Sequence, residues 1–171
     1  MDFSNPSVRN GVICGLILVA YNLVLYIAGP RMIFSWMAWL SLVIYVVFMV
    51  RSVREAREGE SEFSFKQALK PSFITYLVAS LMAMIFSYVL FNFIDPGLMD
   101  IQREKTMEMV EWMARFGGED AVEAALEKVE GDDFSFGPLK AIQAYALGLI
   151  FPGFIIAAII SLIMRRKPVE S

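Results

Sequence analysis

The sequence predicts an all-α integral membrane protein with four transmembrane helices and an extramembrane acidic helical hairpin between the third and the fourth. Of its 171 residues, 57% are hydrophobic, whereas a soluble domain contains about 45–50% apolar residues. The hydrophobic residues are concentrated in four blocks with almost no charge, each about as long as a bilayer is thick. The other charged residues lie outside these blocks. We therefore expect residues 1–171 to form a single four-span membrane domain.

The first span is expected over residues 10–28 and the second over residues 32–50, each with 19 residues that carry no charge. Nineteen helical residues extend roughly 28 Å, close to the hydrocarbon thickness of about 30 Å. A secretory signal peptide fits the first block poorly, because no small-x-small cleavage site follows it. Residues 29–31 are expected to form a tight turn. The first two spans are therefore expected to be antiparallel neighbours.

Glycines and tryptophans mark specific positions in these two spans. Gly11 and Gly15 form a GxxxG pair, a spacing that lets another helix backbone approach closely. Glycine is also common in membrane helices without such a role, so both interpretations stand. Trp36 and Trp39 lie near the start of the second span, where indole rings are expected at the level of the lipid headgroups.

A polar segment, residues 51–70, connects the second and third spans. Gly59 is expected to end the helix that continues the second span. Residues 63–70 are then expected to form a short surface helix, with a re-entrant loop as the rarer alternative. The third span is expected over residues 71–94, which contain 24 residues without a charge. Pro71 is expected in its first turn, where a missing N–H costs little.

The segment after the third span is predicted to be an extramembrane helical hairpin over residues 95–133. Asp95 is a favourable N-cap and Pro96 suits the first helical position. Gly117 and Gly118 are expected to separate two amphipathic helices, lying on the membrane or standing off it. The segment contains twelve acidic residues: Asp95, Asp100, Glu104, Glu108, Glu111, Glu119, Asp120, Glu123, Glu127, Glu130, Asp132 and Asp133.

The fourth span is expected over residues 139–164, and Pro152-Gly153 is expected to kink it, because proline removes a backbone hydrogen bond. Small residues recur every four positions in the last two spans, a pattern that favours close helix packing. These stripes are Ala79, Ala83 and Ser87 in the third span, and Gly153, Ala157 and Ser161 in the fourth.

The basic residues predict the orientation. Nine lie on the side that holds both termini and the 51–70 segment, and six lie on the other side. The clusters that directly follow spans, residues 51–57 and 165–167, are on the same side. The positive-inside rule therefore places both termini in the cytoplasm and the 95–138 loop on the outer, periplasmic side.

No group of residues in the sequence points to a catalytic, cofactor-binding or metal site. The chain has no histidine, and Cys14 is its single cysteine, so the commonest metal ligand and general base is missing. The interiors of the spans lack charged residues, which argues against a proton-coupled transporter. We therefore expect no enzymatic activity, catalytic residue, cofactor or metal. The sequence also lacks basic patches interleaved with aromatic residues, so nucleic acid is not expected as a partner.

Two short motifs resemble a known family. Ser64-Phe65 is followed by Ala68 and Lys70, and the third span ends in the sequence of residues 92–96, NFIDP. This combination is similar to the bacterial membrane proteins catalogued as domain of unknown function 4199, and the resemblance covers nearly the whole chain. It implies four spans in a bacterial inner membrane. It implies no activity, substrate or cofactor.

The sequence favours a non-enzymatic structural or partner-binding component of the bacterial inner membrane. Its environment is the lipid bilayer, and its partner is a second copy or another membrane protein, which the acidic hairpin would contact. The alternative is a small-solute or ion permeation unit, indicated by the Pro152-Gly153 break and by the polar residues Asn22, Tyr88 and Asn92. A membrane enzyme is a third and weaker hypothesis, in which outer carboxylates would do the chemistry.

Overall fold

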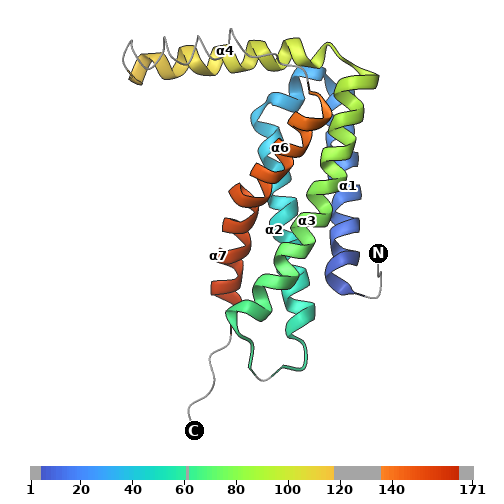
Figure 1. The fold of residues 1–171 in the computed structure, drawn as a ribbon, viewed down its shortest axis with the longest axis vertical. Coiled ribbons are helices and arrows are strands. Elements are labelled where there is room, and N and C mark those ends of the chain that lie inside the picture. Colours follow the sequence, from blue (N-terminus) through green and yellow to red (C-terminus); the bar gives the residue numbers. More distant parts are fainter. Residues whose placement is uncertain (1–4, 61, 118–135, 166–171) are drawn as a thin grey trace.

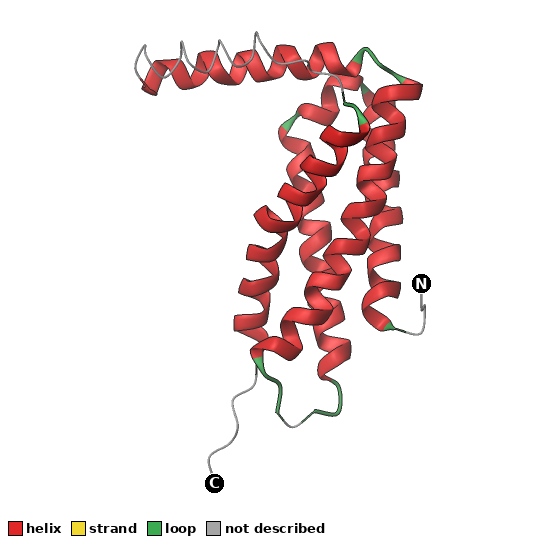
Figure 2. Ribbon diagram, in the orientation of Figure 1, coloured by secondary structure: helices red, strands yellow, loops and turns green. Residues whose placement is uncertain are grey.

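The computed structural model describes residues 5–60, 62–117 and 136–165, and most of these residues are helical (Figures 1 and 2). Four helices are long and apolar enough to cross a membrane: Pro6–Ala28, Trp36–Arg57, Phe65–Ile94 and Pro138–Met164. The predicted all-helical fold with four apolar spans is confirmed. The second helix of the predicted hairpin falls within residues 118–135, which lie outside the described residues.

Helix α1, Pro6–Ala28, begins before the predicted block because the sequence in front of it supplies a cap. The Asn5 side chain accepts a hydrogen bond from the backbone N–H of Ser7 at 2.9 Å, and proline occupies the first turn. The helix ends at Gly29, whose N–H donates to the carbonyl of Leu25 at 3.1 Å.

The connection between α1 and α2 differs from the predicted tight turn. Two short 3-10 helices, η1 (Pro30–Phe34) and η2 (Trp36–Trp39), precede α2 (Leu40–Arg57). Ser35 separates them, and its hydroxyl accepts a hydrogen bond from the N–H of Met37 at 3.3 Å. This serine cap starts a new helix at Trp36, so the second span does not begin at Met32 as predicted. Gly59, with φ of +86°, follows the end of α2 as expected.

Helix α3, Phe65–Val89, continues as a π-helical segment, η3, over Leu90–Ile94. The expected separate surface helix over residues 63–70 is wrong, because one continuous helix starts at Phe65. A capping box fixes this start: the N–H of Ser64 donates to Gln67 Oε1 at 2.7 Å, and the N–H of Gln67 donates to Ser64 Oγ at 3.4 Å. Pro71 consequently lies inside the helix and not in its first turn.

Helix α4, Leu98–Gly117, runs across one end of the bundle, roughly perpendicular to the spans (Figure 1). Asp95 caps the turn before it, since its Oδ1 accepts from the N–H of Gly97 at 3.1 Å. Pro96 is part of this turn, so the prediction that it is the first helical residue is wrong. The side chain of Leu98 is fully buried and clusters with Leu90, which fixes the start of α4 against the end of the third span.

The fourth span consists of α6 (Pro138–Gly148), a π-helical segment η4 (Leu149–Phe154) and α7 (Ile155–Met164). Phe151 leaves the helical conformation, with φ of −134° and ψ of 118°. The predicted interruption at Pro152-Gly153 is therefore confirmed.

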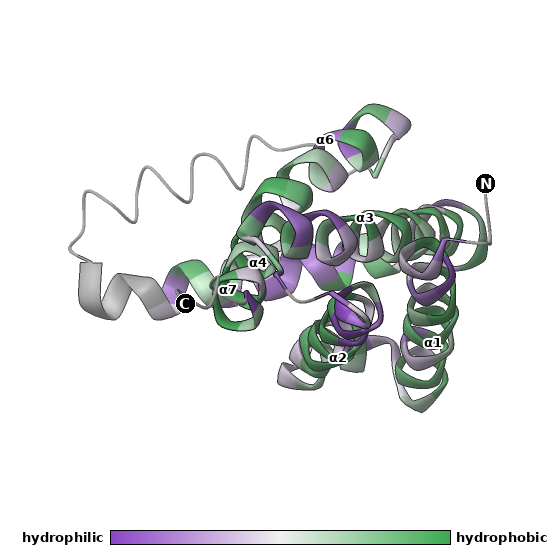
Figure 3. Ribbon diagram, turned by 90° about the horizontal axis from the view of Figure 1, so that it is seen from below, coloured by the Kyte–Doolittle hydropathy of each residue, from purple (hydrophilic) through white to green (hydrophobic). Residues whose placement is uncertain are grey.

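The spans pack around α3, which contacts α1, α2 and α7 (Figures 1 and 3). The core between them includes Cys14, Met49 and Ala79, each with no exposed surface. Large apolar side chains also cover the outside of the bundle, among them Ile27 and Ile163, which are 75% and 76% exposed. An apolar exterior of this kind suits a lipid environment.

Candidate functional site

The two glycines of α1 lie in close contact with α3. A Cβ atom on Gly11 would come within 2.8 Å of Val78 Cβ and 3.0 Å of the carbonyl oxygen of Thr75. A Cβ atom on Gly15 would come within 2.6 Å of Met82 Sδ. The helix-contact interpretation of this GxxxG pair is therefore confirmed, and its partner is the third span.

The small residues of the fourth span pack on α3 as well. The ring of Tyr76 fills the space that a side chain at Gly153 would need, and the Tyr76 hydroxyl donates to the carbonyl of Gly148 at 3.0 Å. Ala157 and Ser161 have no exposed surface. The interruption of the fourth span at Pro152-Gly153 thus leaves space for the Tyr76 ring of the third span to pack against it.

Two of the three polar side chains expected to mark a permeation path, Asn22 and Asn92, are bonded to backbone groups. Asn22 Nδ2 donates to the carbonyl of Leu18 at 2.8 Å. Asn92 Nδ2 donates to the carbonyls of Tyr88 and Phe136 at 2.8 and 2.9 Å. These bonds stabilise the helices and join η3 to the start of the fourth span.

A buried polar cluster joins the first three spans at the end of the bundle that holds the N-terminus and the α2–α3 loop. Thr75 Oγ1 lies 2.6 Å from Ser52 Oγ and within hydrogen-bonding distance of the carbonyls of Ser7 and Pro71, at 3.1 and 2.9 Å. The side chains of Ser52 and Thr75 have no exposed surface. Because buried hydroxyls are costly without partners, this cluster fixes how the three helices lie against one another.

Glu55 extends this cluster toward the helix ends. Its carboxylate accepts from Asn10 Nδ2 at 3.0 Å, from Arg9 Nη2 at 3.1 Å and from Arg51 Nε at 3.0 Å. Two other buried polar atoms, Asn10 Oδ1 and Ser72 Oγ, have no hydrogen-bond partner among the described residues. Sequence patterns did not predict this cluster. The one sequence feature that could have indicated it is the occurrence of several small polar residues near one end of the first three spans.

The other end of the bundle displays the acidic face of α4, which we define as Asp100, Glu104, Glu108 and Glu111. All four residues are exposed. Their spacing of four, four and three residues places them on one side of the helix. Arg31 Nη2 bonds both carboxylate oxygens of Glu104, at 2.9 and 3.1 Å, and so connects α4 to η1.

All three tryptophans of the chain belong to this same end. Trp36, Trp39 and Trp112 are 74%, 72% and 60% exposed. Tryptophan is enriched where a membrane meets water, because its ring is apolar and its N–H is polar. This distribution matches an end of the bundle that lies at the lipid headgroups, with α4 along the surface.

Among the residues that the structure describes, no group of three or more His, Cys, Asp or Glu side chains is placed to hold a metal ion. The carboxylates of the acidic face are exposed and follow one helix. This arrangement offers a charged surface for contact.

The family model described as "Protein of unknown function (DUF4199)" matches residues 9–166. This match covers almost all of the four-span unit. The chain belongs to the DUF4199 family. No curated protein and no solved structure matches the chain significantly.

Within this DUF4199 protein, the matched residues include both ends of the bundle. The match begins at Arg9, beside the buried polar cluster, and ends two residues after Met164, the last residue of α7. Helix α4 and the polar cluster, apart from Ser7, therefore lie within the matched residues.

Proposed function

We propose that this DUF4199 protein is a non-enzymatic component of the bacterial inner membrane that binds a partner through the acidic face of α4. The observation that supports this proposal most is the placement of α4. It is held across one end of the bundle by Leu98 and by the Arg31–Glu104 ion pair, and its carboxylates are exposed.

The charge of this face indicates the chemistry of the partner. Complementary potentials bring protein surfaces together and select between partners, so a cationic surface fits best. We expect this partner to be a second copy of the chain or another membrane protein. Basic residues at the opposite end favour an orientation with both termini in the cytoplasm and the 95–138 loop outside.

The alternative function, permeation of a small solute or an ion, gains no support from the two asparagines of the spans. Asn22 and Asn92 bond to backbone carbonyls. The space beside Gly153 is filled by the ring of Tyr76. Partner binding remains the function that the arrangement of residues supports best.

Cross-linking in native membranes tests the proposal. A photo-reactive residue placed at Gln102, next to the acidic face, should give a discrete adduct that contains a second copy or one membrane protein. The triple substitution Asp100→Asn, Glu108→Gln and Glu111→Gln should reduce that adduct at least about fivefold, because contacts across an interface depend on complementary charge. It leaves the Arg31–Glu104 pair intact and removes the Lys105–Glu108 ion pair within α4.

The matched control neutralises three acidic residues at the opposite end of the bundle: Glu58→Gln, Glu60→Gln and Glu62→Gln. This control should keep the adduct at the level of the unmodified protein. Capture of the monomer alone in every variant would refute partner binding through α4, as would an equal loss of the adduct in both triple variants.

A further inference from the structure

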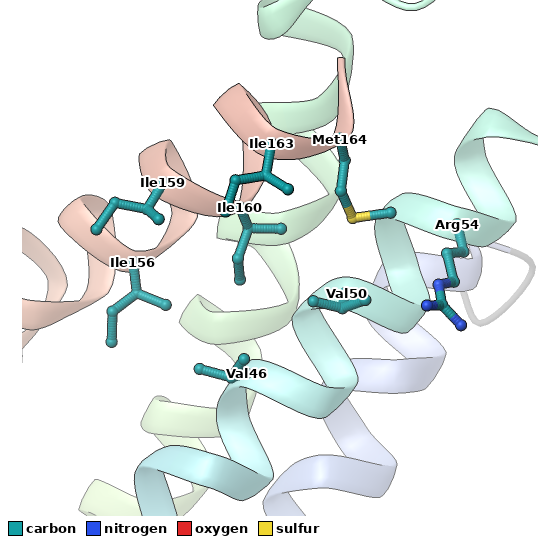
Figure 4. A pocket seen from close by; sticks show the side chains of 8 residues that line it. All are labelled: Val46, Val50, Arg54, Ile156, Ile159, Ile160, Ile163 and Met164. Atoms are coloured by element: carbon teal, nitrogen blue, oxygen red, sulfur yellow. The ribbon is translucent and has the colours of Figure 1, made fainter. Parts of the chain in front are cut away.

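A groove of about 480 Å³ lies between α2 and α7 (Figure 4). None of its lining residues belongs to the acidic face. Its walls are aliphatic along most of its length. The lining residues are Val46, Val50 and Arg54 of α2, and Ile156, Ile159, Ile160, Ile163 and Met164 of α7. A volume of this size is comparable to sites that hold an organic ligand, which occupy about 300–1,000 Å³.

Arg54 provides the one charged side chain of this lining. It follows Val50 by one helical turn, so it extends the same face of α2 toward the end of the bundle (Figure 4). The side chain is exposed. The groove is thus apolar in the membrane and cationic where the helices leave it.

The neighbouring arginines on α1 and α2 at this end already have partners. Arg9 and Arg51 both bond to Glu55, at 3.1 and 3.0 Å. Arg57 Nη1 donates to the carbonyl of Met164 at 3.2 Å, which joins the ends of α2 and α7 beside the groove. Among the described residues, no carboxylate lies within 4.0 Å of the Arg54 guanidinium. Of the four arginines on α1 and α2 that the structure describes at this end, Arg54 is therefore the one available to an anion from outside the chain.

We propose that this groove binds one anionic phospholipid, with an acyl chain along the isoleucines of α7 and the phosphate at the Arg54 guanidinium. Two features of the groove select this occupant. Its aliphatic walls suit the apolar surface of a hydrocarbon chain. The guanidinium group of Arg54 lies at the end of the groove where the phosphates of the adjoining leaflet are found. Basic pockets between membrane helices bind anionic headgroups, and guanidinium groups form paired hydrogen bonds with phosphate oxygens. This inference does not depend on the proposed partner.

Native mass spectrometry of the purified full chain tests the proposal. The protein is titrated in detergent with phosphatidylglycerol or phosphatidylcholine that carry identical acyl chains. The unmodified protein should retain one phosphatidylglycerol in preference to phosphatidylcholine. Arg54→Gln should weaken phosphatidylglycerol binding about fivefold, the effect expected of one arginine near anionic lipid. It should leave phosphatidylcholine binding unchanged, and Arg54→Lys should restore most of the preference.

Two further variants test whether the lipid binds in this groove. Arg9→Gln removes the same charge at the same end, but from a side chain already paired with Glu55, and it should keep the preference. Ile159→Trp places a bulky ring in the groove at a residue that is 51% exposed. This substitution should weaken the binding of both phosphatidylglycerol and phosphatidylcholine.

Three results would overturn the inference. The first is an unchanged lipid preference in Arg54→Gln. The second is an equal loss in Arg9→Gln, which would indicate diffuse attraction by the basic end. The third is a dimer in the spectrum that Ile159→Trp abolishes, which would make a second copy the occupant of the groove. Thermal unfolding of each variant in detergent checks that the fold is retained.

Discussion

Individual hydroxyl groups decide how the first three spans are arranged. Thr75 contacts α1 through the carbonyl of Ser7 and α2 through the hydroxyl of Ser52. The hydrophobic effect does not distinguish one rotation of a helix in lipid from another, because lipid tails are as apolar as leucine. Polar contacts between helices supply that distinction, together with the close approach of Gly11 to Val78.

Removal of the Thr75 hydroxyl should therefore loosen the bundle. Thr75→Val keeps the shape of the side chain but leaves Ser52 without its cross-helix partner, which should lower the free energy of unfolding by about 1–3 kcal/mol. The matched control is Thr106→Val on α4, whose hydroxyl bonds only to the carbonyl of Gln102 in its own helix. The free energies of unfolding of the two variants are compared in a detergent titration. Equal stabilities of the two variants would contradict the assigned role of Thr75.

The sequence predicts part of this residue-scale picture. Glycine spacing made Gly11 and Gly15 candidates for a helix contact, with the common occurrence of glycine in membrane helices as the alternative, because a missing side chain is visible in the sequence itself. It could not identify Val78 and Met82 as the partners, since that depends on how far α3 is rotated and shifted. Ser52 and Thr75 gave no signal alone, because single hydroxyls in membrane helices can bond to their own backbone.

At the scale of elements, α4 is the helix whose position carries the proposed function. Its apolar residues Leu98, Ile101, Met109 and Trp112 recur at spacings of three, eight and three, which places them on one face. This face adjoins the acidic face. A helix of this kind lies in the membrane interface with its apolar residues among the lipid headgroups and its charges in water.

Fluorescence of Trp112 tests this position of α4. The double substitution Trp36→Phe and Trp39→Phe leaves Trp112 as the only tryptophan. In vesicles, a quencher attached near the lipid headgroup should reduce its emission more than one at the centre of the bilayer, because an interfacial helix is buried only about 5–10 Å deep. Quenching by aqueous acrylamide alone would show that α4 stands off the membrane.

The boundaries of several elements could not be predicted, although the four spans could. Long blocks without charge identify a span directly, because charge in lipid is costly. Ends depend on local hydrogen bonds. The Ser64–Gln67 capping box begins α3 six residues before Pro71, and Ser35 starts a new helix at Trp36. Such caps involve only a few residues, so the hydropathy pattern, which is longer and stronger, determined the predicted helix boundaries instead.

At the scale of the whole molecule, the four spans separate two chemically different ends. The start of α1, the end of α7, the arginines of α2 and the buried polar cluster lie at one end, while the tryptophans and the acidic face of α4 lie at the other (Figure 1). This polarity is the basis of both proposals. In the first proposal, the acidic face binds a partner on one side of the membrane. In the second, Arg54 binds a lipid phosphate of the opposite leaflet.

Labelling of single cysteines in intact spheroplasts tests this separation most directly. Cys14→Ser removes the native thiol, and Glu111→Cys or Glu62→Cys then places one thiol at each end. We predict that a membrane-impermeant maleimide labels Glu111→Cys in intact spheroplasts and labels Glu62→Cys only after lysis. Labelling of both positions under the same conditions would contradict the four-span arrangement, and the reverse pattern would contradict the proposed orientation.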